Sequence, residues 1–217
     1  MRAASQGDQA ARSAFARGYA SPIRAYLTHR WRGLAATRDL EDAIQDVFVE
    51  CYKPGGVIET ADPGRGDFRA LLYGVVRNVA RRYEERFTQE QRREPGEIVD
   101  LDALPEVSDG LSRVFDRAWA QALLREAVQC HEASAMAGDA DARRRFAILR
   151  MRHDGALPVR EIASALGEPD VEKVHNEYRR ARRDFAVHLR TVVAAHTGVQ
   201  GDRIDDECRR LGELLGS

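Results

Sequence analysis

The sequence predicts an all-α protein in which an acidic linker joins two helical domains. Apolar residues recur at three- and four-residue intervals in several long segments, which is the spacing of helices with one buried face. The chain has 217 residues, of which 43% are hydrophobic and 32% charged, and this composition is typical of helical bundles with substantial cores. Residues 94–110 carry six acidic residues and neither Lys nor Arg, which indicates a linker. We therefore expect domains over residues 1–93 and 111–197, followed by a C-terminal tail over 198–217.

Four helices are expected in the first domain. An apolar stripe around Phe15 and Tyr19 predicts the first, and Ser21–Pro22 predicts the start of the second, because Ser is a favoured N-cap and Pro is tolerated at the first helical position. The third is expected to begin near Asp39 and to end at Pro54–Gly56. The expected buried stripe of the fourth comprises Phe68, Leu71, Leu72, Val75, Val76, Val79 and Tyr83.

Two of these helices carry a charged face beside the apolar stripe. The face of the third helix is acidic and consists of Asp39, Asp42, Asp46 and Glu50. Like charges four residues apart repel one another, so this face indicates either a basic partner elsewhere or a solvated surface. The face of the fourth helix consists of Arg69, Tyr73, Arg77 and Arg81, with Asn78 and Arg82 beside it. These residue types suit single-stranded nucleic acid, because arginine binds phosphate, tyrosine stacks on bases and asparagine recognises a base edge. The alternative is that this arginine-rich face is only solvated.

The second domain is expected to contain a helix pair that can read DNA. A helix from Leu111 should end at residues 137–139, and another helix should follow it. Residues 158–185 then show a short helix that stops at Gly167, a turn, and a longer basic helix with Asp170 as its N-cap. This is the helix-turn-helix pattern, whose second helix can enter a major groove, although many such pairs only form cores. The candidate DNA-contacting residues are Glu172, Lys173, His175, Asn176, Arg179, Arg180 and Arg183. Glu177 is expected to pair with an arginine, and the tail to form a short amphipathic helix.

No motif indicates catalysis, a metal or a cofactor. Cys51, Cys130 and Cys208 are scattered, and no Cys/His pair has the spacing of a zinc site. No Ser/His/Asp set and no phosphate-binding loop occurs, so we expect neither an enzyme nor a cofactor. Without a signal peptide or an apolar run of about 18 residues, we expect a cytoplasmic protein that makes no membrane contact. The net charge of −1 indicates that DNA binding depends on a partner or on one exposed basic patch.

Four blocks of the sequence resemble bacterial RNA polymerase sigma factors of the extracytoplasmic-function group. Asp39–Phe48, DLEDAIQDVF, is similar to D-x-E-D-L-V-Q-E-V-F of region two, and Phe68–Asn78, FRALLYGVVRN, to F-R-x-W-L-Y-R-I-A-x-N. Arg160–Gly167, REIASALG, is similar to E-E-I-A-x-x-L-G of region four, and Tyr178–Phe185, YRRARRDF, to L-x-R-A-R-x-x-L. The blocks stand in the family's order. The sequence departs from the pattern by having Leu71 for Trp and Gly74 for Arg, and two acids in the recognition helix.

The resemblance implies a non-catalytic factor that gives RNA polymerase its promoter preference. It implies that the acidic face of the third helix docks on the clamp helices of the largest polymerase subunit. It further implies that the arginine-rich face of the fourth helix captures the melted minus-ten element, and that the basic helix of region four reads the minus-thirty-five duplex. The expected partners are core polymerase and promoter DNA, and the family allows an anti-sigma factor. The alternative is a stand-alone helix-turn-helix regulator.

Overall fold

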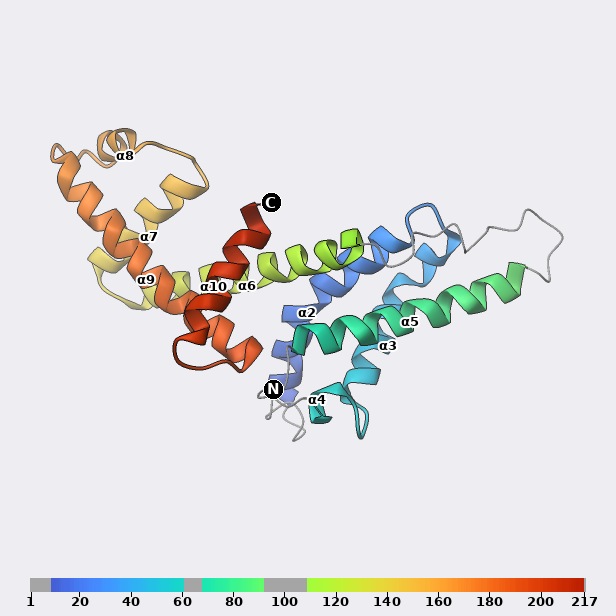
Figure 1. Cartoon of the computed structure of the whole chain (residues 1–217). Coiled ribbons are helices and arrows are strands. Elements are labelled where there is room, and N and C mark those ends of the chain that lie inside the picture. Colours follow the sequence, from blue (N-terminus) through green and yellow to red (C-terminus); the bar gives the residue numbers. More distant parts are fainter. Residues whose placement is uncertain (1–8, 61–67, 92–108, 217) are drawn as a thin grey trace. The chain divides into compact units, whose positions relative to one another are not determined.

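The computed structural model describes residues 9–60, 68–91 and 109–216, and most of these residues lie in helices (Figure 1). No strand occurs among them, which confirms the all-α class. None of the described helices is long and apolar enough to cross a membrane.

The chain divides into two compact units. Unit 1 comprises Met1–Ala122 and Ala194–Ser217, and unit 2 comprises Leu123–Val193. These limits differ from the expected domain limits because α6 (Asp109–Ala137) and α9 (Val171–Thr197) each contribute residues to both units. Most of the expected linker lies outside the described residues.

Unit 1 is built around α3, which packs against both α2 and α5. Its complete helices are α2 (Gln9–Arg30), the 3₁₀ turn η1 (Ala35–Asp39), α3 (Leu40–Tyr52), α4 (Val57–Thr60), α5 (Phe68–Gln91) and α10 (Arg203–Gly216). The ring of Phe68 lies 5.5 Å from that of Phe15 and 5.7 Å from that of Tyr19, so an aromatic cluster joins α2 to α5. Leu72 and Val76 continue this core along α5 and are fully buried.

The predicted helix start at Ser21–Pro22 is wrong, because α2 continues through Pro22. Proline inside a helix removes one backbone hydrogen bond at a cost of about 3 kcal/mol. Tyr19 and Ile23, on either side of it, are both buried in the core of unit 1. Burying such side chains stabilises by about 1.5–3 kcal/mol each, which is enough to hold the helix continuous across the proline.

The prediction that Leu71 is buried is also wrong, because 45% of this residue is exposed. Phe68, Leu72, Val76, Val79 and Tyr83 of the predicted stripe are buried as expected. Leu71 lies at the edge of that stripe, and no neighbouring helix of the described chain covers it fully.

A buried polar cluster ties α2 to α5 within unit 1. The Glu84 carboxylate accepts hydrogen bonds from both Nε and Nη2 of Arg30, the latter at 2.9 Å. Trp31 Nε1 donates to the same carboxylate at 2.9 Å. The side chains of Arg30 and Glu84 are only 9% and 7% exposed. The hydrogen bond with Glu84 raises the pKa of Arg30, so this guanidinium stays charged inside the unit.

Unit 2 holds the second half of α6, α7 (Ala140–His153), α8 (Val159–Ala165) and most of α9. Ile148, Ile162 and Val174 are fully buried and bring α7, α8 and α9 into one core. The predicted break after α6 is confirmed, because Asp139 caps α7 by accepting a hydrogen bond from Ala142 N at 2.7 Å.

The predicted turn between α8 and α9 is also confirmed. Gly167 has a φ of +64°, the left-handed conformation that glycine adopts without strain after a helix. The Asp170 carboxylate accepts hydrogen bonds from Glu172 N at 3.0 Å and from Lys173 N at 3.2 Å, as expected of an N-cap. These two local features fix where α9 begins and therefore which of its residues face solvent.

Candidate nucleic-acid interface

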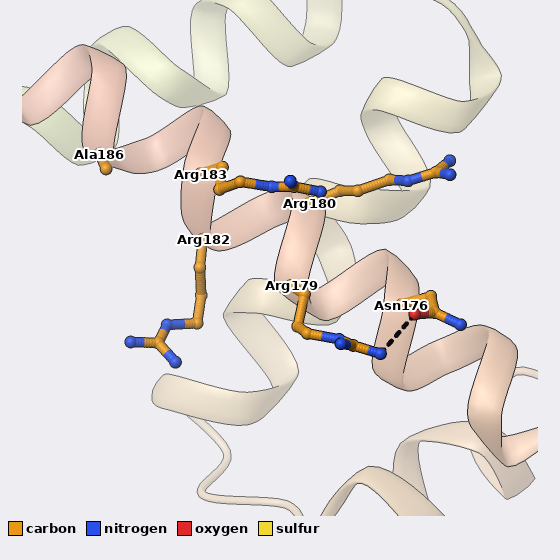
Figure 2. Close-up of a pocket in the computed structure, with 6 residues that line it drawn as sticks. All are labelled: Asn176, Arg179, Arg180, Arg182, Arg183 and Ala186. Carbon is orange, nitrogen blue, oxygen red and sulfur yellow. Dashed lines mark hydrogen bonds between the residues drawn. The ribbon is translucent and has the colours of Figure 1, made fainter.

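The outer face of α9 carries a dense group of arginines. Val174 and Ala181 hold the helix in the core of unit 2 and are fully buried. The side of α9 away from this core presents a hollow of about 510 Å³ that is open to solvent (Figure 2). It is lined by Asn176, Arg179, Arg180, Arg182, Arg183 and Ala186. Four guanidinium groups within little more than one helical turn form a strongly cationic surface, which we call the arginine hollow.

Of the three predicted arginines in the hollow, one has partners within the chain and two form no ion pair with a described residue. Arg179 Nη2 donates to Asn176 Oδ1 at 2.6 Å and lies 3.3 Å from Glu172 Oε1 (Figure 2). Arg180 and Arg183 are exposed and form no ion pair with any described residue. Their charge is therefore available to an external anion.

Lys173, also predicted to contact phosphate, lies outside the hollow and has an anionic partner. Its Nζ is 2.7 Å from Glu168 Oε2. This hydrogen bond raises the pKa of Lys173 and lowers that of Glu168. His175 is exposed and lies outside the hollow as well. The structure thus brings Asn176, Arg179, Arg180 and Arg183 together and leaves Glu172, Lys173 and His175 nearer the start of the helix.

Glu177 pairs with an arginine, as predicted. Arg144 Nε of α7 lies 3.0 Å from Glu177 Oε2, and Arg144 Nη2 lies 3.2 Å from Glu168 Oε2. Arg145 of α7 pairs with Asp184 at 3.1 Å further along α9. These ion pairs hold α9 against α7 through residues that do not line the hollow.

Arg182 belongs to the hollow but was missing from the predicted contacts. Its guanidinium lies 5.9 Å from the centre of the Tyr178 ring. The sequence contains the signal that identifies it: Arg179, Arg182 and Ala186 are spaced by three and then four residues, and such positions share a helix face.

The acidic face of α3 lies in unit 1, and most of its charge is matched by α5. Asp39 lies 3.1 Å from Arg86, and Asp46 accepts a hydrogen bond from Tyr83 Oη at 3.0 Å. Burial, together with this hydrogen bond, raises the pKa of Tyr83 to about 12.

The two remaining acids of that face differ from one another. Glu50 pairs with Arg82 at 2.9 Å and also with Lys53, which lowers the pKa of its carboxyl. Asp42 is exposed and forms no ion pair with a described residue. The basic partner that the stripe requires is thus found largely within the chain, and Asp42 is the acid that remains available.

The predicted nucleic-acid face of α5 is exposed only in part. Asn78, Arg81 and Arg82 are exposed, and Arg77 is half-exposed. Arg69 and Tyr73 do not lie on an open surface, which corrects the expectation for these two residues. Residues of α6 cover them. Because α6 is distant in sequence from α5, the helical pattern of α5 could not reveal this contact.

Comparison with known proteins assigns no family. No protein-family model matches this chain, and no curated protein or solved structure matches it either. Among the described residues, no group of His, Cys, Asp or Glu is arranged to hold a metal ion.

Proposed function

We propose that this chain is a sigma factor that binds core RNA polymerase and directs it to promoters. The observation that supports this proposal most strongly is the arginine hollow of α9, which follows a short helix and a capped turn. Arginines on the exposed side of the second helix of such a pair are the usual means of contacting DNA phosphates around a major groove. Asn176, at the edge of the hollow, has an amide that can recognise an adenine edge.

In this proposal the two units would contact different parts of the promoter. The arginine hollow of unit 2 would contact the minus-thirty-five duplex. The exposed residues Asn78 and Arg81 and the half-exposed Arg77, all on α5 of unit 1, would contact unpaired minus-ten DNA. The sequence blocks similar to region two and region four are what connect both surfaces to a sigma factor, since the hollow alone is consistent with any duplex-reading protein.

A second candidate function is a stand-alone helix-turn-helix regulator. It is favoured by the pairing of α3 with α5, because Asp39, Asp46 and Glu50 have partners inside unit 1 and do not require polymerase. Under this alternative the chain binds duplex DNA tightly without core polymerase. Under the first proposal, tight and specific binding appears only when core polymerase is added.

Replacing Arg183 by alanine tests the role of the hollow. Arg183 has no ion-pair partner in the described chain, so its loss should remove one phosphate contact and little stability. We expect holoenzyme affinity for duplex DNA to fall across sequences, and the slope of log K against log salt to decrease by about one. The measurement is a fluorescence titration at several salt concentrations, with DNA selected by the wild-type holoenzyme from a random library.

Arg190→Ala is the matched control, since it removes an exposed arginine of α9 that lies beyond the hollow. It should leave both the affinity and the slope near wild type. An unchanged slope in Arg183→Ala would contradict a DNA-facing hollow.

A further inference from the structure

The first half of α6 covers two residues of the predicted single-strand surface within unit 1. Arg69 Nη1 lies 3.5 Å from Asp116 Oδ1, and its guanidinium stands over the ring of Trp119 at 4.9 Å from the ring centre. The Tyr73 ring meets the Phe115 ring edge to face, with 5.6 Å between centroids. Three residues of α6, namely Phe115, Asp116 and Trp119, thus contact the side chains of Arg69 and Tyr73.

The chemistry of this contact is the chemistry by which proteins hold single-stranded DNA. Such sites combine arginines on phosphate with aromatic rings on bases. Asp116 supplies an anion to Arg69 in the way a phosphate would, and Phe115 and Trp119 supply flat rings in the way bases would. Residues of α6 therefore satisfy the groups that unpaired DNA would otherwise satisfy.

The contact between α5 and α6 also has two features that weaken it. Tyr73 Oη and Trp119 Nε1 are both buried, and neither finds a hydrogen-bond partner in the described chain. A buried polar group without a partner costs free energy, so these two atoms weaken the contact that buries them. The side chains of Arg69 and Asp116 are still 20% and 23% exposed, which leaves their ion pair open to competition by another anion.

We propose that the Leu111–Ala122 portion of α6 is an internal mimic of single-stranded DNA that unpaired DNA must displace from α5. This inference depends on the proposed function, because it assigns the α5 surface to unpaired DNA. The portion of α6 acts as a competitor: it holds Arg69 and Tyr73 in the free protein and leaves when DNA offers phosphates and bases. Arg77, Asn78 and Arg81 stay accessible and provide the first points of contact.

The test uses the full chain and a short, fluorescently labelled single-stranded DNA of random sequence. Asp116→Ala removes the carboxylate that competes for Arg69 and should tighten binding of this probe about fivefold, equivalent to about 1 kcal/mol. Glu213→Ala is the matched control because it also removes one carboxylate, and so makes the same change in net charge, at an exposed position of α10 in the same unit. It should bind the probe like wild type. Circular-dichroism melts establish that each variant is folded.

Tryptophan emission supplies a second readout. The chain has two tryptophans, Trp31 and Trp119, which are 0% and 1% exposed. Trp31 hydrogen-bonds to Glu84 and should remain buried, whereas Trp119 should become exposed when DNA displaces α6. We expect the emission of the wild-type protein to shift to longer wavelength on adding the probe, and Trp119→Phe to lose this response.

The outcomes separate this inference from the proposed function. Binding of the probe without an emission shift, together with equal affinities of wild type and Asp116→Ala, would overturn the displacement and leave the proposed function standing. If no variant binds single-stranded DNA, with or without core polymerase, both proposals fail together.

Discussion

Replacing Glu84 by alanine should lower the free energy of unfolding by about 3–5 kcal/mol, the range found when one partner of a buried ion pair is removed. The variant leaves the Arg30 charge and the Trp31 N–H inside unit 1 without their acceptor. The midpoint of thermal unfolding should fall by roughly 6–20 °C for a chain of this length. A thermal melt followed by tryptophan fluorescence measures it, because Trp31 reports on the cluster directly.

Two further variants test that explanation. Glu85→Ala removes an exposed carboxylate from the next position of α5 and should melt within about 0.5 kcal/mol of wild type. The double variant Arg30→Met with Glu84→Leu removes both charges and replaces them by apolar side chains, so it should be more stable than Glu84→Ala alone. If Glu84→Ala and Glu85→Ala melted together, the cluster would have no role in stability.

Reversing Asp42 to arginine should weaken binding to core polymerase by about two orders of magnitude. Like charges brought together at an interface cost several kcal/mol, and about 1.4 kcal/mol corresponds to a tenfold change in affinity. Asp42 is the acid of the α3 face that forms no ion pair within the described chain. Its reversal should cost the fold only about 0.6–2 kcal/mol, because a favourable acid in the first turn of a helix is replaced by an unfavourable cation of similar weight. A pull-down with core polymerase, alongside a circular-dichroism melt, makes the measurement.

Asp46 is the less suitable position for that test. It accepts the hydrogen bond from the buried Tyr83 hydroxyl, so its reversal would disturb the core of unit 1 as well as the surface. Glu213→Arg is the matched control, because it reverses an exposed acid of the same unit on α10. A folded Asp42→Arg variant that binds core polymerase like wild type would exclude docking through this face and favour the stand-alone regulator.

The sequence by itself determined the helices and most of their ends. The break after α6, the cap at Asp170 and the glycine stop at Gly167 were all predicted. Helical periodicity, N-caps and glycine stops depend on residues within about one or two turns of each other, so the sequence contains them locally. The arginines of the hollow were predicted for the same reason, with Arg182 the one omission.

Only the tertiary structure decided what each face of these helices contacts. The continuity of α2 through Pro22 depends on burial against other helices, and the partners of the acidic α3 face lie on α5. The covering of Arg69 and Tyr73 by α6 likewise joins residues that are distant in sequence. A charged face shows the same pattern in the sequence whether it meets solvent, another helix of the same chain or a partner. Which of these it meets depends on packing between distant segments, and no local spacing records that.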